Sequence, residues 1–174
     1  MKIRCDLHVN DGARKLVLVA GPQETDEHLA LKLAGFLLFW DLSPIVDASA
    51  KHPALLDQEF RPDLMALDET GEAKLWVECG KVTQHKLSKV ARRFGRARLV
   101  VLKETEADAR RFRADSDREF DGPAPVEIWA WPQRQFRDWM SALGEKTEVF
   151  GEARGRMLNI VVNERPLVAE LVSY

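Results

Sequence analysis

Apolar and polar side chains alternate at the start of the chain, in KIRCDLHVN. A second apolar run, RKLVLVA, follows the turn sequence Asn10-Asp11-Gly12. Alternation with a period of two is typical of strands that bury one face, and the turn joins two such strands. We therefore expect a β-hairpin at residues 2–20. The run RMLNIVV, followed by NERP and LVAELVS, predicts a second hairpin at residues 156–173.

Between residues 24 and 40 the apolar positions recur every three or four residues, which is the period of an α-helix. Thr25 precedes two acidic residues, a combination that favours a helix start. The positions expected on the buried face are Leu29, Leu33, Phe36, Leu37 and Trp40.

Shorter runs further along predict alternating strands and helices. FRPDLMAL and AKLWVECG read as two strands joined by a turn, TQHKLSKVARRF as a helix, and ARLVVL as a fully buried strand. The order strand, helix, strand over residues 75–101 implies a crossover and a parallel pair of strands. We expect a short strand at Ile45-Val46, then helices in EADARRFRADSDREF and PQRQFRDWMSAL around a strand in VEIWAW.

The composition favours one globular domain over residues 1–174, with 45% hydrophobic and 31% charged residues. The longest apolar run, Leu33 to Trp40, is much shorter than the roughly 20 residues that span a bilayer, so no membrane association is expected. The first residues lack the apolar centre of a signal peptide. Two cysteines, Cys5 and Cys79, do not form a disulfide framework. These features predict a reduced, cytoplasmic protein.

Positive charge is concentrated in one segment, although the net charge is −2. From Cys79 to Lys103 the chain has no acidic residue. Concentrated positive charge attracts a phosphate backbone, so we expect this segment to favour nucleic acid. A solvated helix face with extended lysines is the alternative. The basic residues of the segment are Lys81, Lys86, Lys89, Arg92, Arg93, Arg96, Arg98 and Lys103.

Two acidic residues fall where neighbouring strands are expected to meet. Asp63 follows Pro62, and Glu78 lies in the strand LWVECG on the opposite face from Leu75, Val77 and Cys79. A buried carboxylate needs a cation, a hydrogen-bond partner or a cleft. Carboxylates at the same level of adjacent strands can share a hard cation such as Mg²⁺ or Mn²⁺. A hairpin with two unrelated acids is the other interpretation.

Several strings of this sequence resemble the YaeQ family, which is similar in fold to the PD-(D/E)XK nucleases. They are ETDEHLALKLAGFLLFWD, PDL, LWVECG, HKLSKVARRFGRARLVVL and MLNIVVNERPLVAELVSY, and together they cover most of the chain. The resemblance implies an α/β (α+β) fold with a restriction-endonuclease-like αβββαβ core at about residues 24–140. It also implies an accessory antiparallel sheet from the hairpins at about residues 2–20 and 156–173.

The resemblance also implies roles for particular residues. Asp63 and Glu78 would bind Mg²⁺ or Mn²⁺, assisted by Glu24 or Glu27, although Glu27 can instead complement the helix dipole. Nucleases of this type carry a lysine two residues after the second acid, but Gly80 stands there. Lys86, which matches the family's H-K motif, or Lys81 would replace it. Residues expected to contact nucleic acid are Gln84, Lys89, Arg92, Arg93 and Arg96.

These features predict a Mg²⁺-dependent protein that cleaves phosphodiester bonds of nucleic acid. The first alternative is a catalytically inactive nuclease fold that binds nucleic acid or a protein partner, which the displaced lysine favours. The second is a cytoplasmic interaction protein with no role in nucleic-acid binding, which only the mildly acidic net charge supports.

Overall fold

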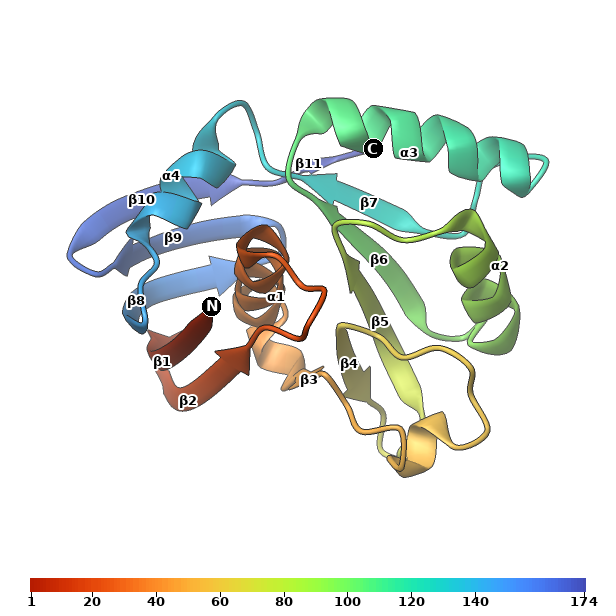
Figure 1. Cartoon of the computed structure of the whole chain (residues 1–174), viewed down its shortest axis with the longest axis horizontal. Helices are drawn as coiled ribbons and strands as arrows, with labels where there is room; N and C mark the ends of the chain where they lie inside the picture. The colour runs from red at the N-terminus through yellow and green to blue at the C-terminus, as the bar shows by residue number, and fades with distance from the viewer.

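The computed structural model describes residues 1–174 and has two β-sheets with a helix between them (Figure 1). The first sheet, in the order β10-β9-β8-β1-β2, contains β1 (Lys2–Val9), β2 (Gly12–Val19), β8 (Lys146–Arg154), β9 (Met157–Val162) and β10 (Arg165–Glu170). The second sheet, in the order β11-β7-β6-β5-β4-β3, contains β3 (Ile45–Val46), β4 (Leu64–Leu67), β5 (Ala73–Cys79), β6 (Arg98–Lys103), β7 (Glu127–Ala130) and β11 (Val172–Ser173). The helices are α1 (Asp26–Leu38), α2 (Gln84–Arg93), α3 (Glu106–Glu119) and α4 (Gln135–Ala142).

Helix α1 is the central element. Every residue from Leu29 to Leu38 is buried, because one core cluster joins α1 to both sheets. A helix that is apolar on all sides is stable only when it is surrounded in this way. Gly35 allows α1 to approach the second sheet closely, since a Cβ there would lie 3.0 Å from Cδ1 of Leu102.

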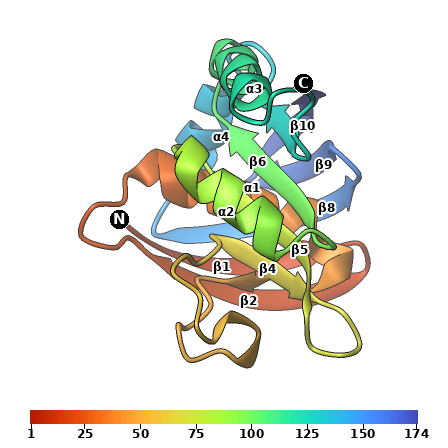
Figure 2. The same cartoon turned by 90° about the vertical axis from the view of Figure 1, so that its right-hand side faces the viewer.

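Helices α2 and α3 cover the other face of the second sheet (Figure 2). Trp76, Leu87 and Phe112 belong to a second apolar cluster on this side. Strands β5 and β6 are parallel, with Glu78 opposite Val101, which confirms the predicted crossover through α2. Along β5, Val77 and Cys79 therefore face α1, and Trp76 faces α2 and α3.

The terminal hairpins are confirmed, but the way they join is different from the prediction. The pattern of residues 146–154 was not assigned to a strand, yet β8 lies between the two hairpins. It pairs with β1 in parallel and with β9 antiparallel, so the predicted antiparallel accessory sheet is a mixed sheet. The expected last strand is also divided, because β11 leaves the first sheet and pairs with β7 of the second.

The remaining helices agree with the sequence pattern with one difference. Helix α4 begins at Gln135, three residues after the predicted start at Pro132. No helix is long and apolar enough to cross a membrane.

Candidate metal and catalytic centre

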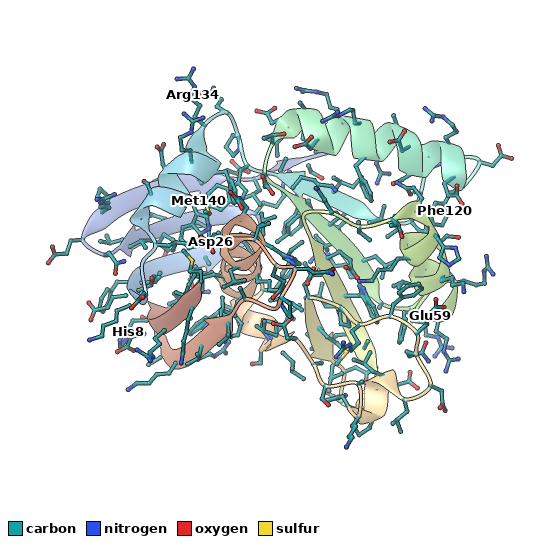
Figure 3. All side chains as sticks on the ribbon, in the orientation of Figure 1. His8, Asp26, Glu59, Phe120, Arg134 and Met140 are labelled. Carbon is teal, nitrogen blue, oxygen red and sulfur yellow. The ribbon has the colours of Figure 1, made fainter.

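The first turn of α1 presents polar side chains toward the second sheet. Asp26 marks this end of the helix in Figure 3. Thr25 caps the helix as predicted, because its hydroxyl accepts a hydrogen bond from the backbone N–H of His28. Glu24 precedes the cap, and its carboxylate accepts a 2.7 Å hydrogen bond from the N–H of Gly21. Residues four apart lie on one side of a helix, so His28 and Lys32 follow Glu24 along the same face.

Asp63 lies where the start of β4 meets the end of β5. One carboxylate oxygen is 2.9 Å from Nε2 of His28, and the other accepts a 2.7 Å hydrogen bond from the N–H of Cys79. Nδ1 of His28 is 3.6 Å from Oε1 of Glu24. Glu24, His28 and Asp63 therefore place one ligand atom each within 4.8 Å of the others. Their side chains are 21%, 27% and 15% exposed, so a small ion can reach them.

Lys32 provides a buried positive charge to the same group of acids. Its side chain is only 2% exposed, and its ammonium binds Glu24. Nζ also lies 2.6 Å from Oδ1 of Asp47 and 3.7 Å from Oδ1 of Asp63. The lysine therefore occupies the space between three carboxylates.

The electrostatic environment shifts the pKa of each of these groups toward its charged form. Burial lowers the pKa of Lys32, but hydrogen bonds to Asp47 and Glu24 outweigh burial and raise it above the usual value. Burial also raises the pKa of Asp63, yet His28, the N–H of Cys79 and Lys32 bring it below the usual value. The pKa of His28 is raised, because its contacts with Asp63 and Glu24 outweigh burial. Three carboxylates thus face two basic side chains, so the network has more negative than positive groups.

Glu78 has its own partners on the α2 side of β5. Its carboxylate accepts a 2.7 Å hydrogen bond from the indole N–H of Trp76. It accepts a second hydrogen bond, also 2.7 Å, from the ammonium of Lys86. The same ammonium donates a 2.9 Å hydrogen bond to the backbone oxygen of Arg61. Burial raises the pKa of Glu78 to about 7 even though Lys86 opposes the shift. The carboxylate is thus poised to gain or lose a proton near neutral pH.

Asp63 and Glu78 are neighbours with different cationic partners. Asp63 contacts His28 and lies close to Lys32 on α1, whereas Glu78 contacts Lys86 on α2. After burial, the charge of Asp63 is the second cause that raises the pKa of Glu78, so the two carboxylates act on each other. That they share one ion stays a prediction.

The other candidates from the sequence lie outside this centre. Lys81 borders a hollow of about 380 Å³ together with Lys103 and Glu104. Glu27 is exposed and does not join the group formed by Glu24, His28 and Asp63. Of the two lysines considered, the structure brings Lys86 to Glu78.

The basic segment is partly used within the fold. Lys89 forms a 2.9 Å ion pair with Glu59, and Arg98 binds Glu127 through two nitrogens. Lys103 is buried and donates to the backbone oxygen of Gly80. Arg92, Arg93 and Arg96 are exposed and form no ion pair with an acidic side chain. These three arginines are therefore the free cations of the predicted binding surface.

Gln84 is oriented differently from the prediction. Its amide nitrogen donates a 3.0 Å hydrogen bond to the hydroxyl of Ser116 on α3, and its amide oxygen is buried without a partner. Gln84 therefore joins α2 to α3 in the structure, a position that does not present it to a phosphate.

The sequence pattern did not predict three residues of the centre, namely His28, Lys32 and Asp47. The spacing Glu24, His28, Lys32 was a usable signal, because it repeats every four residues. Lys32 is also the one charged residue inside the apolar run of the helix. Asp47 carried no signal, since it follows a two-residue strand and adopts a positive φ of 48°.

The fold and the centre define a class of protein: a mixed α+β protein of two sheets with a carboxylate and lysine cluster where α1, β4, β5 and α2 meet. The model of the family described as YaeQ protein matches residues 5–164. The chain therefore belongs to the YaeQ family.

Solved structures of the family share this fold. The YaeQ protein from Xanthomonas axonopodis pv. citri is 19% identical, with a TM-score of 0.70, and the match covers 99% of this chain and 96% of that one. The YaeQ protein from Pseudomonas syringae is 15% identical, with a TM-score of 0.74 and coverage of 99% and 93%. Comparison with the curated proteins gives no match.

Proposed function

We propose that this protein is a metal-dependent hydrolase of phosphodiester bonds in nucleic acid, built on a core of the PD-(D/E)XK type. One observation carries the proposal. Lys86 reaches from α2 to Glu78 at the end of β5, beside Asp63, which directly precedes the neighbouring strand β4. The elements α1, β3, β4, β5, α2 and β6 follow the order of such a core.

The side chains fit a divalent cation. Glu24 and Asp63 offer hard oxygen ligands, which suit Mg²⁺ and Mn²⁺. The imidazole of His28 would bind the ion only in its neutral form, and it favours Mn²⁺ of the two. Glu78 is the further predicted ligand. When bound, such an ion polarises a phosphoryl oxygen and lowers the pKa of its water.

The protein's own groups position the substrate and the acids. The ammonium of Lys86 has three N–H donors, and Glu78 and the backbone oxygen of Arg61 accept from two positions around it. The remaining donor can bind a phosphate oxygen and stabilise the negative charge that develops on it. Trp76 fixes the orientation of Glu78, and His28 fixes that of Asp63.

A second candidate function is binding without cleavage. Lys32 already pairs with Glu24 and Asp47 and lies 3.7 Å from Asp63, so part of the negative charge that a metal ion would balance is already compensated. In that case nucleic acid or a protein partner would be held, and no bond would be broken.

Calorimetric titration with Mn²⁺ and Mg²⁺ distinguishes the metal-dependent hydrolase from the protein that binds without cleavage. Wild type should bind the ion, and the double variant Asp63→Asn, Glu78→Gln should not. A matched control, Asp115→Asn with Glu119→Gln on the exposed face of α3, removes the same charge and should bind as wild type does. Equal binding by wild type and the Asp63, Glu78 variant would reject the proposed site.

A further inference from the structure

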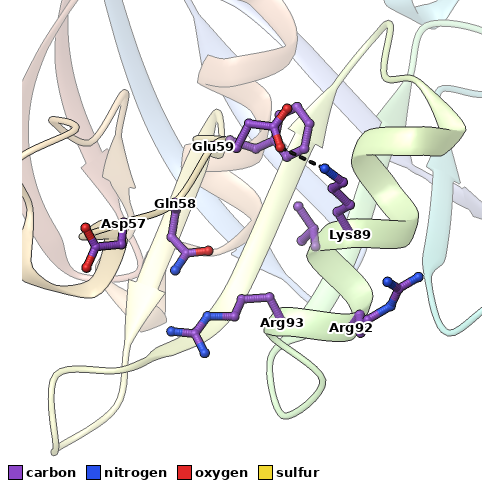
Figure 4. A pocket seen from close by; sticks show the side chains of 8 residues that line it. Asp57, Gln58, Glu59, Lys89, Arg92 and Arg93 are labelled. Atoms are coloured by element: carbon purple, nitrogen blue, oxygen red, sulfur yellow. Dashed lines mark hydrogen bonds and ion pairs between the residues drawn. The ribbon is translucent and has the colours of Figure 1, made fainter.

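Two hollows form a groove along α2, and none of Asp63, Glu78 and Lys86 lines them. One hollow of about 460 Å³ lies between α2 and residues 57–60 (Figure 4). A second of about 670 Å³ lies between residues 93–97, residues 53–58 and the turn between β4 and β5. Gln58 and Arg93 line both hollows, so the two are adjacent.

Cations line the helical wall of this groove. Lys86, Lys89 and Arg93 are three and four residues apart, which places them along one side of α2. Lys86 contacts Glu78, so this row begins at the candidate centre. In Figure 4 the side chain of Arg93 extends from α2 toward Gln58. Arg96 continues the positive wall of the second hollow.

Three acidic residues, Asp57, Glu59 and Glu72, line the two hollows against the four cations Lys89, Arg92, Arg93 and Arg96, so a positive excess remains. Glu59 is bound by Lys89 through a pair whose side chains are 60% and 46% exposed, so a phosphate can replace the carboxylate at little cost. Asp57 lies farther from α2 than Gln58 does (Figure 4). Arg93 and Arg96 have no acidic partner.

The opposite wall includes an aromatic ring. Phe60 is half-buried, lines the first hollow and meets His85 of α2 edge to face, with ring centroids 6.1 Å apart. Aromatic rings beside a row of cations are the pattern of surfaces that bind single strands, where bases stack and the backbone follows the charge. The bases of a duplex are stacked on one another, so they cannot stack on Phe60 unless they are first taken out of the helix.

We propose that this groove binds single-stranded nucleic acid and leads it to the candidate centre. The proposal rests on the proposed function for its substrate class. It concerns a surface separate from the carboxylates, so it is tested without metal. The sugar-phosphate chain follows Lys89, Arg93 and Arg96, and one base stacks on Phe60.

Binding is measured by fluorescence polarisation in EDTA, over a series of salt concentrations, with labelled (dT)20, labelled (rU)20 and a duplex of mixed sequence. Wild type should bind at least one single strand more tightly than the duplex. Arg93→Ala with Arg96→Ala should weaken binding about tenfold or more and reduce the salt slope by about 1.4, because each lost phosphate contact contributes about 0.7. Phe60→Leu, which keeps an apolar side chain in the core, should weaken binding about fivefold.

The control is Arg111→Ala with Arg118→Ala. These two arginines of α3 are exposed, and their replacement removes the same charge. It should leave the affinity within about twofold and keep the salt slope. The proposal is overturned if the duplex binds as tightly as both single strands, if no strand binds, or if the α3 variant loses as much affinity as the α2 variant. Cleavage with metal by a protein that shows any of these results would retain the proposed function and reject the groove.

Discussion

Lys86 of α2 and Glu78 at the end of β5 lie 2.7 Å apart, Nζ to Oε2. In the proposed function this lysine of α2 takes the place of the one that the nuclease pattern puts two residues after the acid. Gly80 stands at that place with a φ of 70°, a left-handed conformation that strains any residue with a Cβ. Backbone geometry therefore explains why a lysine at position 80 is disfavoured and one on α2 is accommodated.

Replacing Lys86 tests its role in the reaction. In the proposed mechanism the ammonium of Lys86 binds a phosphate oxygen, so Lys86→Met should slow cleavage with Mn²⁺ by about 100-fold or more. Single-turnover rates on a labelled oligonucleotide measure this loss. Lys81→Met serves as the control and should cut as wild type does, since Lys81 lies beside Lys103 and Glu104. A normal rate for Lys86→Met would remove this residue from the mechanism.

Replacing Lys32 tests whether the acids of the centre require a cation. Lys32→Met leaves Glu24, Asp47 and Asp63 facing one another, so we expect the free energy of unfolding in EDTA to fall by about 3 kcal/mol. Mn²⁺ should restore part of the stability, because an ion that binds only the folded state stabilises it. Urea unfolding with and without MnCl₂ gives both values.

The exposed pair of Lys89 and Glu59 provides the control for this variant. Lys89→Met should lower the free energy of unfolding by no more than about 1 kcal/mol and should not respond to Mn²⁺. Unchanged stability of Lys32→Met in EDTA would contradict the role assigned to this lysine.

Glu78 predicts a dependence of stability on pH. Its pKa is about 7 in the folded protein and 4.5 in the reference state, so the folded protein binds more protons between these values. Stability should therefore fall as pH rises from about 4.5 to 7. Glu78→Gln should lose this part of the slope, as measured by urea unfolding at several pH values. Identical slopes for the variant and wild type would show that Glu78 is not the responsible group.

His28 adds a second contribution to the dependence of stability on pH, at higher pH than that of Glu78. Its pKa is raised by Asp63 and Glu24 against the effect of burial, so its stabilising charge is complete below the reference value of 6.5. It is lost as pH rises through the raised value. The difference in unfolding free energy between wild type and His28→Gln should thus be larger at pH 6 than at pH 9. A constant difference would contradict a charged pair with Asp63.

The sequence predicted the local elements well and the long-range pairings less well. The helical spacing of apolar residues predicted α1. The alternation of apolar and polar residues predicted β5 and the hairpin of β1 and β2. Strand β8 was missed because its buried residues, among them Val149, are separated by charged ones and its partner β1 is far away in sequence. Pairing across such a distance leaves no local signal.

The candidate centre was predicted in part for similar reasons. Asp63, Glu78 and Lys86 belong to short motifs and could be found from the sequence. Lys32 and Asp47 enter only through packing, because the position of residue 47 depends on a short strand paired to β4. The composition of the basic segment also does not show which of its cations form ion pairs within the fold, as Lys89 and Arg98 do, and which arginines remain free.

Metal-dependent cleavage tests the central claim most directly. Labelled single-stranded and duplex oligonucleotides are incubated with wild type and with Asp63→Asn, in Mn²⁺ or in EDTA, after melting curves have shown that both proteins are folded. We predict products from wild type in Mn²⁺, none in EDTA, and a rate at least about 100-fold lower for Asp63→Asn. No cleavage of any strand by wild type with metal, or equal cleavage by the variant, would contradict the proposed hydrolase.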